Sequence, residues 1–302
     1  MLSKLIPAFL FASAVWAGLI EDVRTDIARN DFAAGDSLIA RYRSQQGVTP
    51  EMLEALSWLG RGALAAKKLD KAEAYAAETQ RLAVEQLKHR ALDAEPHLPI
   101  ALGAAIEVRA QVSAAQGERS EAVLFLRDQL ATYRNTSIRT RIQKNINLLS
   151  LEGKVAPPLE EREFFGTKPA PLASLRGKPV LLFFWAHWCG DCKQEGPILA
   201  KLEQQYAGRG LVLIAPTRRY GYVASGEEAP PGEEMKYIEA VRHKFYPDLL
   251  SAPAPVSEEN FKNYGASTTP TLVLVDRRGI VRMYHPGLMT MDELRAALDK
   301  IG

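Results

Sequence analysis

The sequence predicts two domains: an all-α N-terminal domain of helix-turn-helix hairpins, and a C-terminal α/β domain whose mixed sheet is flanked by helices. Residues 19–151 are rich in Ala, Leu, Glu, Gln and Arg, which favour helix, and show almost no strand pattern. From residue 153 on, prolines appear and short apolar runs alternate with amphipathic segments. The 302 residues also exceed the usual size of a single core. We therefore expect a helical domain at 19–152 and an α/β domain at 153–302.

The first 17 residues have the pattern of a signal peptide. Lys4 precedes the apolar run 5–15, and the small-residue pattern V-W-A at 15–17 predicts cleavage after Ala17. The apolar run is much shorter than the ~20 residues that span a bilayer, which makes an uncleaved membrane tether the less favoured alternative. The sequence thus predicts an extracytoplasmic protein, periplasmic or secreted, in a compartment where paired cysteines can be oxidised.

Three segments of the helical half resemble one another: each has a polar turn followed by a small residue that opens an amphipathic helix. They are 29–42, 67–83 and 115–133, with Gly35, Ala72 and Ala122 as the small residues. Upstream of the second segment, Gly60 is small enough to let two helices approach closely. The pattern resembles degenerate tetratricopeptide repeats, and an unrelated helical bundle is the alternative. The resemblance implies a concave face that could hold a protein partner.

The second half reads as alternating strands and helices. The apolar run 179–186 has the length and composition of a fully buried central strand. The other expected elements are a helix at 193–207, a strand at 211–216, a helix at 233–245, a hairpin at 271–285 that turns at Arg278-Gly279, and a helix at 291–301. This order predicts an α/β fold with a mixed sheet.

Both cysteines of the chain, Cys189 and Cys192, lie in the motif WCGDC between the buried strand and the following helix. This spacing can serve a redox couple, a metal site or haem attachment. Haem attachment requires histidine where Lys193 stands, and a structural zinc site requires four ligands. A dithiol redox couple is therefore favoured, and we expect neither a cofactor nor a bound metal.

Several motifs in residues 155–302 resemble those of the TlpA/ResA-like thiol–disulfide oxidoreductases, a branch of the thioredoxin-fold redoxin group. They are the segments GKPVLLFFWAHWCGDCKQEGP and YGASTTPTLVLVDRRGIV, which occur in the order typical of that branch. The resemblance implies a thioredoxin-like fold and thiol–disulfide oxidoreductase activity for this half of the chain. It does not extend to the helical half.

Each residue of the motif receives an expected role. Cys189 begins a helix, where free N–H groups and the helix dipole favour a thiolate, so we expect it to be the exposed nucleophile. Cys192, one turn deeper, is the expected resolving thiol. The resemblance makes Pro270 the cis-proline opposite the cysteines, which would hold the backbone of Thr269 open for a substrate strand. Trp188 is expected near the surface, in contact with substrate.

Three further side chains near the cysteines carry weaker expectations. Glu195 stands where the resembling branch has an acid, and its position on the face of Cys192 would let it exchange a proton with that thiol. A solvated helix carboxylate is the alternative. His187 is expected to be a surface loop residue; the alternative is that, when protonated, it stabilises the Cys189 thiolate and opposes the effect of Asp191 on the redox potential. The negative charge of Asp191 beside Cys189 disfavours the thiolate and favours a reducing couple.

Together these patterns predict an extracytoplasmic reductase of protein disulfides that draws its electrons from a membrane thiol donor. The alternative is a partner-binding helical-repeat adaptor with a subsidiary redox or metal-handling domain. The net charge of +2 and pI of about 8.4, without a basic cluster, do not predict nucleic-acid binding. The loop 217–232, which is rich in aromatic, glycine and proline residues, could cover the cysteines or only cap the domain.

Overall fold

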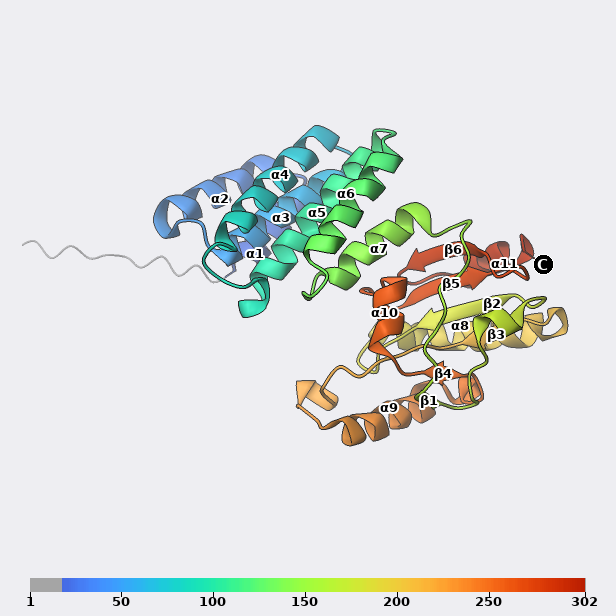
Figure 1. Ribbon diagram of the computed structural model, residues 1–302. Helices are drawn as coiled ribbons and strands as arrows, with labels where there is room; N and C mark the ends of the chain where they lie inside the picture. Colours follow the sequence, from blue (N-terminus) through green and yellow to red (C-terminus); the bar gives the residue numbers. More distant parts are fainter. Residues whose placement is uncertain (1–17, 302) are drawn as a thin grey trace, which may run out of the picture. The chain divides into compact units, whose positions relative to one another are not determined.

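A computed structural model describes residues 18–301 of the chain (Figure 1). The signal peptide expected at residues 1–17 therefore lies outside the described residues. The chain forms two compact units that divide between Ala105 and Ile106, within helix α5 (His97–Ala115). Each unit is described by itself below, and the domain boundary expected at 152/153 stays a prediction.

The first unit is entirely helical. It contains α1 (Leu19–Ala28), α2 (Phe32–Gln46), α3 (Pro50–Ala65), α4 (Leu69–Gln86), the 3₁₀ helix η1 (Leu92–Ala94) and the first half of α5. Helix α3 packs on α4 at Gly60, where an added Cβ would lie 3.6 Å from the Cβ of Tyr75 and 3.7 Å from the backbone nitrogen of Ala76, which are ordinary contact distances. Ala72 and Ala76 are buried along this contact. Small residues thus line this helix contact, and an alanine would also fit at Gly60.

The second unit begins with the rest of α5, α6 (Arg119–Thr132) and α7 (Arg139–Ser150). Its strands are β1 (Phe164–Phe165), β2 (Val180–Phe184), β3 (Val212–Ile214), β4 (Ala254–Pro255), β5 (Thr271–Val275) and β6 (Val281–Pro286). Its further helices are η2 (Leu172–Leu175), α8 (Gly190–Tyr206), η3 (Ala207–Arg209), η4 (Ala224–Gly226), α9 (Pro231–Phe245), η5 (Pro247–Leu249), α10 (Glu258–Tyr264) and α11 (Met291–Asp299). The main sheet has the order β3-β2-β5-β6, with β2 and β3 parallel and the other pairs antiparallel. The mixed sheet expected from the sequence is confirmed.

Strand β2 is the central strand that positions the cysteines. All five of its residues are buried, as its continuous apolar run predicts. Leu181 and Phe183 pack into the core on the side of α8 and α11, whereas Leu182 and Phe184 pack into a second core with residues of α10. Helices therefore cover both faces of β2 and fix the segment that leaves its carboxyl end.

The expected hairpin is formed by β5 and β6, and Gly279 supplies its turn with a φ of +79°. Two features were not expected from the sequence. Helix α10 begins after Ser257, whose side chain accepts hydrogen bonds from the backbone N–H groups of Glu259 and Asn260. The two-residue strands β1 and β4 pair with each other and are too short to show a period of two.

Helix α7 packs against α10 and β6 within the second unit. The side-chain amide of Asn147 donates to the carbonyl oxygen of Asn263, at 3.4 Å. Gly265 ends α10 with a φ of +61°, and a Cβ there would lie 2.6 Å from the backbone Cα of Lys144. The backbone of α7 thus lies directly against the turn that leads to Thr269 and Pro270.

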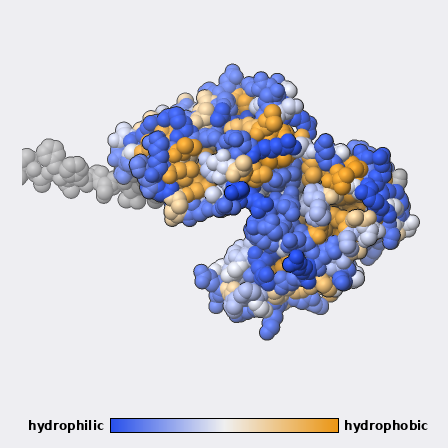
Figure 2. All heavy atoms as spheres, viewed as in Figure 1, coloured by the Kyte–Doolittle hydropathy of each residue, from blue (hydrophilic) through white to orange (hydrophobic). Residues whose placement is uncertain are grey.

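On the face drawn in Figure 2, hydrophobic residues occur in small groups separated by hydrophilic residues. Trp188 is one of the large hydrophobic side chains with considerable exposure, at 50%. Within residues 18–301, no helix combines the length and the apolar character needed to cross a membrane.

Candidate functional site

The two cysteines form a disulfide at the point where β2 leads into α8. Their Cα atoms lie 5.3 Å apart, and Cys189 caps the helix: its Sγ accepts a hydrogen bond from the backbone N–H of Cys192 at 3.0 Å. The same N–H would stabilise a Cys189 thiolate in the reduced protein, together with the helix dipole. Cys192 is fully buried, as expected.

The expectation that Cys189 is exposed is wrong for this oxidised state, because only 3% of its surface is accessible. Its Sγ lies 3.4 Å from the carbonyl oxygen of Thr269, on the loop that precedes β5. Trp188, the residue before it, is half exposed instead, as expected from the sequence, while Trp185 is buried. The exposed ring of Trp188 and the loop that carries Thr269 thus flank the Sγ atom of Cys189.

The peptide bond between Thr269 and Pro270 is cis, as the motif predicts. The fold thereby brings four of the predicted site residues together: Cys189, Cys192, Thr269 and Pro270. The hydroxyl of Thr269 is buried, and it has no hydrogen-bond partner among the described residues. The catalytic and substrate-binding roles assigned to these residues stay predictions.

Glu195 lies one turn after Cys192 on α8 and is completely buried, so the alternative of a solvated carboxylate is wrong. Its Oε2 accepts a hydrogen bond from the backbone N–H of Met289 at 3.2 Å, whereas Oε1 has no partner within residues 18–301. Burial raises the pKa of Glu195 to about 7; the Met289 N–H opposes this effect and the charge of Glu293 adds to it. Near neutral pH this carboxyl can therefore both give and take a proton.

His187 is also buried, at 1% exposure, and its expected position on the surface is wrong. Its ring contacts three tyrosine rings at centroid distances of 5.3–5.4 Å; they belong to Tyr220, Tyr222 and Tyr237. Burial lowers the pKa of His187, although the nearby carboxylate of Glu234 works against this. A neutral His187 supplies no positive charge to the Cys189 thiolate.

The loop 217–232 supplies two of these rings and lies beside the active site. Glu234, buried at the start of α9, accepts hydrogen bonds from the backbone N–H groups of Tyr220 and Gly221, the latter at 2.9 Å. The ring of Trp188 meets Tyr220 edge-on at a centroid distance of 5.6 Å. The loop therefore covers His187 and supports Trp188. Sequence reasoning missed this arrangement because Glu234 is far from the cysteines along the chain.

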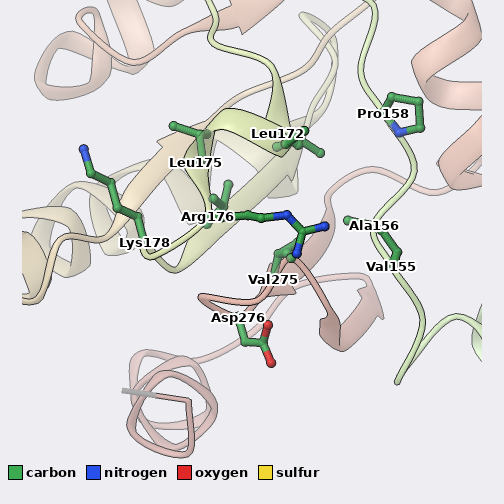
Figure 3. A pocket seen from close by; sticks show the side chains of 12 residues that line it. Val155, Ala156, Pro158, Leu172, Leu175, Arg176, Lys178, Val275 and Asp276 are labelled. Carbon is green, nitrogen blue, oxygen red and sulfur yellow. The ribbon is translucent and has the colours of Figure 1, made fainter.

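A cavity of about 660 Å³ adjoins Trp188 and Thr269. A second, more apolar cavity of about 230 Å³ lies at the other end of β2, lined by Val180 and Val275 (Figure 3). Two of its charged groups are engaged within the fold: Arg176 donates to the carbonyl of Arg278, and Asp276 pairs with Arg282. Of these two cavities, the one that adjoins Trp188 and Thr269 lies near the cysteines.

Among residues 18–301, no three His, Cys, Asp or Glu side chains gather where they could hold a metal ion. The groups at the Cys189 sulfur are the sulfur of Cys192, a helix N-terminus and the carbonyl oxygen of Thr269, and the buried carboxyl of Glu195 lies one turn beyond Cys192. These groups suit the transfer of electrons and protons between sulfur atoms.

Residues 171–302 match the family model described as a thioredoxin-like domain. The chain is 30% identical over 148 residues to the thioredoxin-like protein YneN of Bacillus subtilis (strain 168), an alignment that covers 49% of this chain and 79% of YneN. It is 27% identical over 132 residues to the thiol–disulfide oxidoreductase ResA of Geobacillus thermodenitrificans (strain NG80-2), covering 43% of this chain and 67% of ResA.

A third relative is the thiol:disulfide interchange protein DsbE of Pseudomonas fluorescens biotype C, with 28% identity over 148 residues, 48% of this chain and 74% of DsbE. The tetratricopeptide resemblance of residues 19–152 stays a prediction. The fold, the cysteine pair and these relatives agree, and the chain belongs to the thioredoxin-like family, in its TlpA/ResA-like branch of thiol–disulfide oxidoreductases.

Proposed function

We propose that this protein is an extracytoplasmic reductase of protein disulfides. The proposal rests on the Cys189–Cys192 pair at the N-terminus of α8. This pair lies next to the loop that contains the cis-proline Pro270, and the buried carboxyl of Glu195 follows one turn later on the helix. Such a pair exchanges with other disulfides when its first thiol is a thiolate and its second is close by.

In the reduced protein, the Cys189 thiolate attacks one sulfur of a substrate disulfide. A mixed disulfide forms as the substrate S–S bond breaks, and one substrate sulfur leaves as a thiolate. The Cys192 thiolate then attacks the Cys189 sulfur, which closes the Cys189–Cys192 disulfide and releases the second substrate sulfur. The substrate gains two electrons and, in water, two protons; the protein is left in the oxidised state described above.

Glu195 is proposed to assist the second step, in which Cys192 attacks the mixed disulfide. Cys192 must lose its proton before it can attack, yet it is buried in a place that disfavours a thiolate. Glu195 lies on the same helical face, one turn away, with a free carboxylate oxygen and a pKa of about 7. It can therefore take the proton from Cys192 as a general base and pass it on during regeneration.

Thr269, Pro270 and Trp188 form the proposed contact surface for the substrate. The Thr269 backbone lies against the nucleophilic sulfur, and Trp188 is the exposed aromatic side chain next to it. An extended substrate segment that pairs with the backbone of the Thr269 loop would bring its own disulfide to Cys189.

The direction of electron flow is proposed from Asp191, which is exposed in the first turn of α8 beside Cys189. Its negative charge disfavours the thiolate and so makes the dithiol the better electron donor. The oxidised pair must then be reduced again by an external dithiol, for which we propose a membrane thiol donor. Export of the chain rests on the signal-peptide pattern at residues 1–17.

Reduction of insulin by the protein from residue 18 onward, with a dithiol as electron source, tests the proposal. We expect turnover by the wild type, none by Cys189→Ser, and accumulation of a mixed disulfide with Cys192→Ser, detected as added mass. Equal turnover by wild type and Cys189→Ser would instead favour the helical-repeat adaptor with a subsidiary redox or metal-handling domain. Equilibration of the wild type with glutathione buffers tests the direction: a potential above that of glutathione contradicts a reductase.

A further inference from the structure

We propose that the 660 Å³ cavity beside the active site binds an acidic segment of the substrate polypeptide, close to the cysteine that reacts. The inference rests on the proposed function and narrows its substrate class. The cavity is lined by the connection between α6 and α7, by Trp188, by the start of the loop 217–232, and by residues of α10 and the Thr269 loop. All of these segments belong to the unit that begins at Ile106.

Cationic side chains dominate the charge of the cavity. Its lining contains four of them, against the single carboxylate of Glu258: Arg134, Arg139, Arg218 and Lys262. Glu258 pairs with Arg218. The neighbouring Glu259 lies 2.8 Å from Lys262 and only 3.8 Å from Arg139. Two carboxylates thus face four cations, and the cavity keeps an excess of positive charge that attracts an acidic segment.

Two buried polar atoms in the lining have no hydrogen-bond partner within residues 18–301: Nε of Arg218 and Oγ1 of Thr269. A buried donor without a partner costs free energy that a bound acceptor can recover. The Arg218 guanidinium is also held in place, 4.5 Å from the ring centroid of Tyr220 and 5.5 Å from that of Phe261. A fixed guanidinium with a free N–H suits a carboxylate oxygen better than it suits water.

The position of the cavity links binding to the reaction. Thr269 contributes to the lining, and its carbonyl oxygen lies 3.4 Å from the Sγ of Cys189. A substrate chain that occupies the cavity therefore has its reacting cysteine within a few residues of its acidic side chains, since an extended chain advances about 3.3 Å per residue.

Three matched peptides test the inference, each joined through its single cysteine to the same reporter by a disulfide. They differ only in the residues flanking cysteine, which are Glu, Gln or Lys. We measure the second-order rate constant of their reduction by the reduced protein. We expect the Glu peptide to react about tenfold faster than the Gln peptide at low salt, and the Lys peptide to react slowest. The preference should shrink as salt screens the charges. Equal rates, or a slower Glu peptide, would overturn the inference.

A pair of variants separates the cavity from the general surface charge. Arg134→Glu reverses an exposed charge in the lining, whereas Arg127→Glu makes the same change at an exposed position of α6 outside the lining. We expect the ratio of Glu to Gln rates to fall to about one in Arg134→Glu and to stay at its wild-type value in Arg127→Glu. An equal fall in both variants contradicts a role for the cavity.

Binding of a labelled, cysteine-free Glu peptide to the oxidised protein, followed by fluorescence polarisation, needs no exchange chemistry. Weaker binding of the Gln peptide, and of the Glu peptide to Arg134→Glu, supports the inference even if no disulfide is reduced; in that case only the proposed function fails. Reduction of all three peptides at one rate, without selective binding, overturns the inference and leaves the proposed function intact.

Discussion

Glu195 lies one helical turn beyond Cys192 on α8, and neither side chain has any exposed surface. We propose that in the reduced protein the Cys192 thiol and the Glu195 carboxyl compete for one proton, because both lie on one face of the helix and are shielded from water. The pKa of Glu195, raised to about 7 by burial, places this competition at neutral pH. The raised pKa makes the stability of the folded protein depend on pH near neutrality, and we propose that it does the same for the exchange chemistry.

The release of a trapped mixed disulfide should depend on Glu195. In wild type, the rate of the Cys192 attack is expected to rise with pH around 7, as the carboxylate forms. Glu195→Gln should remove this rise and slow the step at least about tenfold, a modest share of what general base catalysis contributes. Single-turnover release measured from pH 5 to 9 checks this. Glu203→Gln, at a half-buried glutamate of the same helix, is the control and should keep the wild-type profile.

The same carboxyl should weaken the folded protein at high pH. Because its pKa of about 7 in the folded protein lies above the usual glutamate pKa of 4.5, the folded state binds the proton more tightly. Protonated Glu195 therefore adds to the free energy of unfolding below about pH 4.5. This contribution is lost as the pH rises through 7, and the loss is on the order of 3 kcal/mol at most. The urea midpoint of oxidised Glu195→Gln, relative to wild type, should therefore be higher at pH 8 than at pH 5. A constant difference would contradict the raised pKa.

Glu234 should control access to the loop 217–232. Its carboxylate accepts the backbone N–H groups of Tyr220 and Gly221, and Glu234→Ala leaves both donors without that acceptor. We expect trypsin to cleave after Arg218 or Arg219 at least about fivefold faster in this variant, since each lost hydrogen bond of this kind is worth about 1 kcal/mol or more. Glu233→Ala, one residue earlier and exposed, should leave cleavage unchanged.

Gly265 should be indispensable to the second unit. A Cβ there meets the backbone of Lys144 at 2.6 Å, and its φ of +61° disfavours a side chain, so Gly265→Ala is expected to cost about 3 kcal/mol. Gly153 has a similar φ of +82°, but a Cβ there would have no atom within 4 Å. Gly153→Ala should therefore lower the free energy of unfolding by only about 1 kcal/mol. Urea denaturation of both variants measures the difference, and equal costs would exclude the backbone contact as its cause.

Much of the α/β fold could be predicted from the sequence, because β2 and the hairpin of β5 and β6 are governed by local apolar patterns and a glycine turn. The redox motif of the two cysteines and the cis peptide bond between Thr269 and Pro270 could also be predicted, because each is identified by a short stretch of sequence. The burial of His187 could not, because it depends on tyrosines of the loop 217–232 and of α9, which reach it only in the folded chain.

The burial of Cys189 and the start of α10 were missed for related reasons. The low exposure of Cys189 follows from the approach of the Thr269 loop, a contact between segments 80 residues apart. Helix α10 spans only seven residues, too few to show a helical period, and its signal is the capping serine Ser257. Contacts distant in sequence and very short elements are the features that local patterns do not reveal.

The contact of α7 with Gly265 bears on how the catalytic half could be isolated. A shortened protein of residues 153–302 would contain the whole segment that matches the family, with both cysteines and Pro270. It would nevertheless lack α7, and the faces of α10 and β6 that α7 covers would be opened to water. Transplanting or engineering this active site therefore requires at least α7 as well, because the α7 backbone lies against Gly265, in the turn that leads to Thr269 and Pro270.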